Sequence, residues 1–290
     1  AIATAKAEAE LLKEKAKEGK EDAVEKPEAP VEAKSGSIPI HMWIFMALMA
    51  VVIYSGFGAP YNVPAVAIFV VAWLVAAMIP KTRTVLAAHP LSDMKFFFFI
   101  FALIPVQTLF TYNWLVLPQY LERAFEGGFV SDRFELFANL NPILIFVAVP
   151  IVTALTMKKK VYNMMVIGTF IMAAPAFLLA LGTSLPLLLG YLLIMTIGEA
   201  MWQPRFLQYA AEIAPEGRTG AYMGVAQFPW FLTKMLVPRY TGVMLQRFCP
   251  AEGQRDPETM WFYFSLIAIL STFLLIVAKG WVGKDFKTKA

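Results

Sequence analysis

Two ionisable side chains inside long apolar segments are the residues of this sequence best suited to chemistry. Glu199 and Lys234 each lie near the middle of a segment long enough to cross a bilayer. A charge at the centre of a membrane helix costs about 2.5–3.5 kcal/mol on insertion scales, so such residues normally face a bundle interior or a water-filled cavity. The two side chains are therefore candidates for holding a polar solute or for exchanging a proton with each other.

Each charged residue shares a helical face with an amide and large aromatic side chains. The two faces, read at three- and four-residue spacing, comprise Glu199, Trp202, Gln203 and Phe206 on one helix and Gln227, Trp230, Phe231 and Lys234 on the next. A charge, an amide and several rings together form the kind of surface that binds a polar solute. The alternative is a buried Glu199–Lys234 pair that locks two helices, with the rings as ordinary packing.

An earlier apolar segment carries three more polar candidates, Gln107, Tyr112 and Asn113. We predict that they line the same cavity. The alternative is that they hydrogen-bond to neighbouring helices, as polar residues inside membrane bundles commonly do.

Other chemistry finds little support in the sequence. The two histidines, His41 and His89, and the single cysteine, Cys249, are too few and too scattered for a conventional metal site. Neither a phosphate-binding glycine loop nor a nucleophile elbow occurs. We therefore expect no enzymatic activity, no metal, no cofactor and no nucleic-acid partner.

The composition predicts that these residues are positioned by membrane helices. The chain has 290 residues, of which 59% are hydrophobic and 16% are charged, whereas soluble domains are about 25% charged. Continuous apolar runs of about 20 residues are long enough to span a bilayer as helices, and they do not alternate as barrel strands do. We predict an all-α polytopic bundle of about eight spans.

The organisation along the chain follows from breaks in these runs. The predicted segments are a charged leader and linker (1–37), a transmembrane helical hairpin (38–80), a basic linker (81–95), a six-helix bundle (96–280) and a basic tail (281–290). Lys and Arg are concentrated in the loops of one side, which the positive-inside rule makes cytoplasmic. Both termini are then cytoplasmic, or face the equivalent compartment of an organelle. Because the chain begins with Ala, we do not expect residue 1 to be the start of translation.

Several segments together resemble the C-terminal six-helix half of major facilitator superfamily (MFS) transporters. The stretch IGEAMWQPRFLQYAAEIAPEGRTGAYMGVAQFPWFLTK (197–234) is the strongest, with Gly198-Glu199, Ala214-Pro215 and Met223-Gly224 as its best points; segments 108–123, 139–156 and 161–173 also contribute. Within the superfamily the sequence looks most like the proton-dependent oligopeptide transporters. Bacterial members of that family carry an extra helical hairpin between their halves, which would account for 38–80.

The resemblance implies a role in transport. Glu199 would match a family glutamate that contacts the amino end of a bound peptide, and residues along 107–113 and 227–234 would line the same cavity. The six N-terminal helices of the family, with their coupling motif, are not in this sequence. We therefore predict the second half of a proton-coupled transporter for peptides or small polar solutes, in the lipid bilayer, needing an N-terminal half. The alternative is a non-transporting structural subunit of a larger membrane complex.

Overall fold

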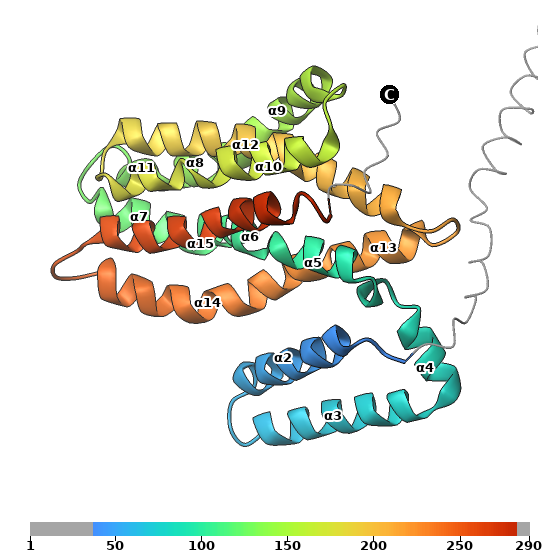
Figure 1. Cartoon of the computed structure of the whole chain (residues 1–290). Coiled ribbons are helices and arrows are strands. Elements are labelled where there is room, and N and C mark those ends of the chain that lie inside the picture. The colour runs from blue at the N-terminus through green and yellow to red at the C-terminus, as the bar shows by residue number, and fades with distance from the viewer. Residues whose placement is uncertain (1–36, 283–290) are drawn as a thin grey trace, which may run out of the picture.

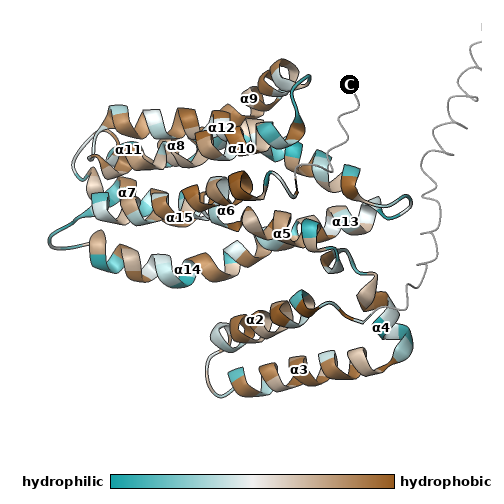
Figure 2. Cartoon of the chain, viewed as in Figure 1, coloured by the Kyte–Doolittle hydropathy of each residue, from teal (hydrophilic) through white to brown (hydrophobic). Residues whose placement is uncertain are grey.

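The computed structural model describes residues 37–282, and within that range every regular element is helical (Figure 1). Hydrophobic residues cover most helices, and hydrophilic residues gather at helix ends and in loops (Figure 2). Many large apolar side chains remain exposed, including Phe146 at 83% and Leu155 at 75%, which suits contact with lipid rather than water. The prediction of an all-α polytopic membrane bundle is confirmed. The predicted leader and tail lie outside the described residues except at 37 and 281–282.

The first described helices form a hairpin beside the main bundle (Figure 1). Helices α2 (Ile40–Gly56) and α3 (Asn62–Met78) are antiparallel neighbours, and α4 (Pro80–Ala87) continues from α3 after a 98° bend. The bend falls at Pro80, which has no backbone N–H to continue the α3 hydrogen-bond ladder. Helix α2 faces the bundle, because its Phe45 ring contacts the rings of Phe97 and Phe228.

The bundle follows a short 3₁₀ turn, η1 (Pro90–Ser92). Its elements are α5 (Met94–Ala102), α6 (Ile104–Leu115), α7 (Leu117–Ala124), η2 (Ser131–Arg133), α8 (Phe134–Ala138), α9 (Leu140–Thr156), α10 (Val161–Ala173), α11 (Ala176–Ala180), α12 (Leu185–Ile213), α13 (Thr219–Ala226), α14 (Phe228–Phe248) and α15 (Pro257–Ala278). Helix α12 packs on α9, α10, α11 and α13, and α6 packs on α14 and α15. Candidate residues on α6, α12 and α14 therefore lie on neighbouring parts of one bundle.

Prolines divide several of the predicted spans into two helices. Pro105 lies at the start of α6 just after α5 ends, Pro175 precedes α11, and Pro229 lies at the start of α14. Each lacks the N–H needed to continue the preceding helix. Pro204 and Pro238 instead lie inside continuous helices. The breaks place short non-helical turns between halves of single spans.

The number of spans differs from the prediction. Among the described residues, five helical segments are long and apolar enough to cross a membrane, or six if the bent α3–α4 pair is one span. Helix α2 has 17 residues, fewer than the roughly 20 that a spanning helix needs. Helix α14 is long enough but carries Lys234, Arg239 and Arg247. Eight spans are therefore not supported by length and composition alone.

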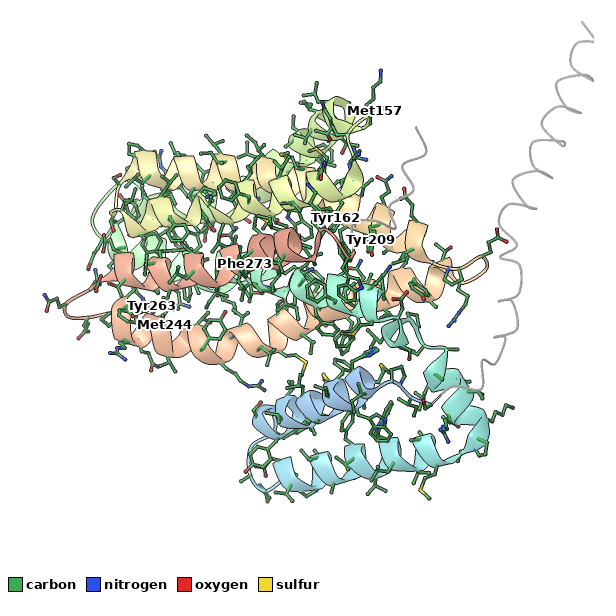
Figure 3. All side chains as sticks on the ribbon, viewed as in Figure 1. Met157, Tyr162, Tyr209, Met244, Tyr263 and Phe273 are labelled. Atoms are coloured by element: carbon green, nitrogen blue, oxygen red, sulfur yellow. The ribbon has the colours of Figure 1, made fainter. Side chains whose placement is uncertain are left out.

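Among the glycines of the described residues, Gly198 lies closest to another backbone, where α12 packs on α10. A Cβ built at Gly198 would lie 2.2 Å from the backbone nitrogen of Met172, and one built at Gly168 would lie 2.8 Å from Cβ of Trp202. The two glycines therefore allow α10 and α12 to pack with their backbones nearly touching. Tyr162 at the start of α10, labelled in Figure 3, fixes the same helix to α15 by donating to the Leu275 carbonyl at 2.6 Å.

Candidate functional site

Six of the residues singled out in the sequence line one small cavity between α6, α12 and the α13–α14 junction. The cavity has a volume of about 130 Å³, and its lining residues are Gln107, Phe110, Trp202, Gln203, Phe206, Leu207, Gln227 and Trp230. Three primary amides and two indoles thus converge from helices far apart in the sequence. The side chains that line the cavity carry no ionisable group.

Gln107 is the most informative residue of this cavity. Its side chain is only 3% exposed, and its Oε1 atom is buried without a hydrogen-bond partner among the described residues. Buried polar atoms are nearly always hydrogen-bonded, so an orphaned acceptor in a cavity wall calls for an explanation. A hydroxyl or N–H donor on a bound molecule would satisfy it. The indole N–H of Trp202 is already used, because it donates to Sδ of Met172 at 2.9 Å.

Glu199 lies outside this cavity. Its side chain is 5% exposed and its Oε2 accepts a 2.8 Å hydrogen bond from Nδ2 of Asn141 on α9. Nδ2 of Asn141 also lies 2.9 Å from Oγ1 of Thr196, one turn earlier on α12. The carboxyl group is therefore held between α12 and α9 inside this chain.

Lys234 lies elsewhere and is exposed. Its Nζ atom is 3.5 Å from the centroid of the Trp230 ring, a cation–π contact. Within the described range no salt bridge joins Lys234 to Glu199. In place of the alternative of a direct Glu199–Lys234 lock, the structure has Asn141 as the hydrogen-bond partner of Glu199. Lys234 remains next to the cavity only through Trp230, which lines the cavity.

We expect Lys234→Met to change the free energy of unfolding by less than about 1 kcal/mol, because an exposed cation–π contact is worth about 0.5–1 kcal/mol. Chemical denaturation of the purified protein in detergent measures the change, with Lys159→Met in an exposed loop as the matched control. A much larger loss for Lys234→Met alone would reveal a buried ionic partner.

Tyr112 and Asn113 are buried and hydrogen-bonded inside the bundle, and neither lines the cavity. The Tyr112 hydroxyl bonds to that of Tyr240 on α14. Oδ1 of Asn113 accepts from the Tyr191 hydroxyl at 2.6 Å. These contacts match the interhelical alternative for these two residues.

Sequence reasoning did not identify Asn141, the residue that holds Glu199. The available signal was a polar Asn at the start of an otherwise apolar run, directly before Pro142. Thr196 also stands three residues before Glu199, where a helix places both on one side. Phe110 and Leu207 were likewise missed as lining residues, because apolar side chains in apolar helices carry no distinguishing pattern.

The fold and the apolar helices define an integral, multi-pass membrane protein. The chain is similar to the Uncharacterized MFS-type transporter YttB of Bacillus subtilis (strain 168), with 27% identity over 149 residues. The matched region is 51% of this chain and 36% of that relative, so the chain spans about a third of the relative's length. No protein-family model matches the chain, and no solved structure matches it. The similarity is to a protein described as an MFS-type transporter, which is the class that the resemblance in the sequence implied.

Proposed function

We propose that this chain is the C-terminal half-bundle of an MFS-type secondary transporter and that the cavity at Gln107 binds part of a small polar solute. The observation that carries the proposal is Gln107. This residue lines a cavity walled by amides and indoles, and its buried Oε1 atom lacks a hydrogen-bond partner among the described residues. The description of the Bacillus subtilis relative as an MFS-type transporter supports the same function.

The lining residues favour an uncharged polar solute. Amides of Gln107, Gln203 and Gln227 can both donate and accept hydrogen bonds, and the rings of Trp202 and Trp230 offer stacking surfaces. Ligand pockets commonly measure about 300–1,000 Å³, whereas this cavity is about 130 Å³. A second bundle facing α6 and α12 would supply the remaining wall, as alternating access between two halves requires. A sugar, a polyol or the backbone of a short peptide fits this chemistry.

We assign proton coupling to Glu199 rather than to a Glu199–Lys234 pair. The carboxyl group is the one buried acidic side chain in the described part of the bundle. It lies on the same helix as Trp202 and Gln203, so α12 carries both the carboxyl group and part of the cavity lining, and rotation of α12 would change which neighbours each of them faces. The Asn141 hydrogen bond is the contact that such a movement must break.

The cavity is tested with Gln107→Leu, and Gln246→Leu is the matched control on the exposed side of α14. Tryptophan emission of the purified protein is titrated with glucose, glycerol and diglycine, because Trp202 and Trp230 line the cavity. We expect Gln107→Leu to lower the affinity for whichever of these solutes binds by about tenfold, since a buried hydrogen bond is lost. Gln246→Leu should bind as the parent protein does. Equal affinity in both variants would contradict the assignment.

A structural role is the second candidate, and the Asn141–Glu199 contact favours it. That hydrogen bond already satisfies the buried carboxyl group by joining α12 to α9 within one chain. Mass spectrometry of the protein purified from its own membrane separates the two functions. A co-purifying six-helix transporter half supports transport, whereas unrelated membrane subunits without such a half support a structural role.

A further inference from the structure

A second, larger cavity lies where the α2–α3 hairpin meets the bundle. It has a volume of about 390 Å³, and its walls come from α2, α3, α4, η1, α13 and α14. Nearly all its lining side chains are apolar, with Phe45 and Phe228 among the largest. The volume lies within the range of about 300–1,000 Å³ that is common for small-molecule sites. The cavity lies outside the solute site of α6 and α12, and no residue lines both.

Direct contacts hold the hairpin against the bundle next to this cavity. The Phe45 ring lies 5.7 Å from that of Phe228 and 5.3 Å from that of Phe101, measured between centroids. Nε2 of His41 bonds to the Leu91 carbonyl at 2.9 Å. These contacts place α2 against the bundle on one side of the cavity.

The polar groups of the cavity are hydrogen-bond donors. Nδ1 of His89 accepts from the Leu91 N–H at 3.2 Å, so the ring proton of a neutral His89 is on Nε2. Burial lowers the pKa of His89, and the Arg218 guanidinium lowers it further, which favours this neutral form. Nε1 of Trp73 is buried without a partner among the described residues. An apolar cavity with two spare donors suits an apolar molecule that carries a hydrogen-bond acceptor.

The surroundings of the donors are basic. Arg218 acts electrostatically on His89, and α4, which contributes Leu86 to the wall, carries Lys81 and Arg83. Asp93 lies nearby as well and keeps its negative charge while it accepts from the backbone N–H groups of Lys95 and Phe96, but the three basic residues outnumber it. Clusters of Lys and Arg at the ends of membrane helices attract anionic lipid headgroups.

We propose that this cavity binds one acyl chain of an acidic phospholipid. The chain lies between α2 and α14, the ester carbonyl accepts from His89 and Trp73, and the phosphate lies toward Arg218. An acyl chain fits the apolar walls, the carbonyl supplies the acceptor that both donors lack, and the phosphate complements the basic residues. The site is independent of the transport proposal, because it uses none of the residues around Gln107.

Gly224 offers a direct way to block the cavity. It lines the cavity, and a Cβ built on it meets nothing within 4 Å, so a larger side chain can be introduced at the cavity wall without a clash at its base. Gly242 on α14 is equally open but does not line the cavity. Gly224→Phe is therefore the blocking variant, and Gly242→Phe is its matched control.

The measurement is native mass spectrometry of the delipidated protein in detergent. The protein is titrated with dioleoylphosphatidylglycerol, with dioleoylphosphatidylcholine of the same chains, and with decylubiquinone. We expect phosphatidylglycerol to bind the parent protein and Gly242→Phe alike, and Gly224→Phe to bind it at least about tenfold more weakly. Phosphatidylcholine should bind several-fold more weakly than phosphatidylglycerol. Equal binding to both glycine variants, or retention of the quinone alone, overturns the proposal.

A second pair of variants keeps the test valid if Gly224→Phe does not fold. Trp73→Phe removes the indole N–H and keeps most of the ring, whereas Trp114→Phe makes the same change at an exposed position of α6. Losing one hydrogen bond to the carbonyl should lower the affinity of Trp73→Phe for phosphatidylglycerol by about fivefold. Unchanged binding in Trp73→Phe, matching that in Trp114→Phe, removes the indole from the site and contradicts the proposed placement of the carbonyl.

Discussion

Gly198→Ala is expected to prevent stable folding of the bundle. The added Cβ would lie 2.2 Å from the backbone nitrogen and 2.6 Å from Cα of Met172, closer than any non-bonded contact permits. Overpacking that side chains can absorb already costs about 1–3 kcal/mol. Here the obstacle is backbone, so α10 and α12 must separate along their contact. We expect a loss above about 3 kcal/mol, which is a large part of the 5–15 kcal/mol that holds a typical domain folded.

Thermal denaturation in detergent, together with the yield of monodisperse protein, measures this loss. Gly242→Ala is the control, because a Cβ at Gly242 meets nothing within 4 Å. It should be neutral or slightly stabilising, since Ala is favoured over Gly inside a helix by about 1 kcal/mol. A Gly198→Ala protein that melts within a few degrees of the parent would show that α10 and α12 do not approach as described.

The sequence was a good guide to the helices and to where they break. Long apolar runs predicted the helices. Prolines in the sequence explain several interruptions, because a missing N–H acts locally whatever surrounds it. Pro105 and Pro229 each lie at the start of a new helix for that reason. The number of spans was less predictable. Helix α14 holds three basic residues and still forms one continuous helix against α6 and α15.

The neighbours of individual side chains were harder to predict. Helical spacing places Glu199 about 60° from Trp202 and about 40° from Gln203 around the axis, at about 100° per residue. A face that broad contacts more than one neighbouring helix. Glu199 reaches Asn141 on α9, whereas Trp202 and Gln203 line the cavity toward α6 and α14. Periodicity identified the residues that share a face but not the helix that each of them contacts.

The walls of a groove near the helix ends were equally hard to predict from the sequence. Met244 of α14 and Tyr263 of α15, labelled in Figure 3, line a groove together with Arg239 and Arg247. In the sequence the two arginines stand eight residues apart in one segment. That spacing gave no sign that α15 would contribute the opposite wall, because that wall depends on how two distant segments pack.

Asn141→Leu is expected to lower the free energy of unfolding by about 2–4 kcal/mol. Leucine has the same branched shape as asparagine but cannot donate to Oε2 of Glu199, so a buried carboxyl group loses the hydrogen bond that holds it. Leaving a buried polar group unsatisfied costs about 1–3 kcal/mol, and more if the group is charged. Chemical denaturation measures the loss, and Asn163→Leu in α10 provides a control at another asparagine of the bundle.

The double variant Asn141→Leu/Glu199→Met distinguishes a purely structural hydrogen bond from a carboxyl group that also serves transport. Replacing both partners of a buried polar pair by apolar groups of similar shape is often nearly neutral, so we expect the double variant to regain most of the stability that Asn141→Leu loses. The coupling between the two substitutions is then the measured difference from additivity. If the carboxyl group also serves transport, this stable protein will have lost the pH dependence of solute uptake. Stability regained together with unchanged pH dependence would leave Glu199 with the structural role alone, because the same hydrogen bond would then account for everything the residue does.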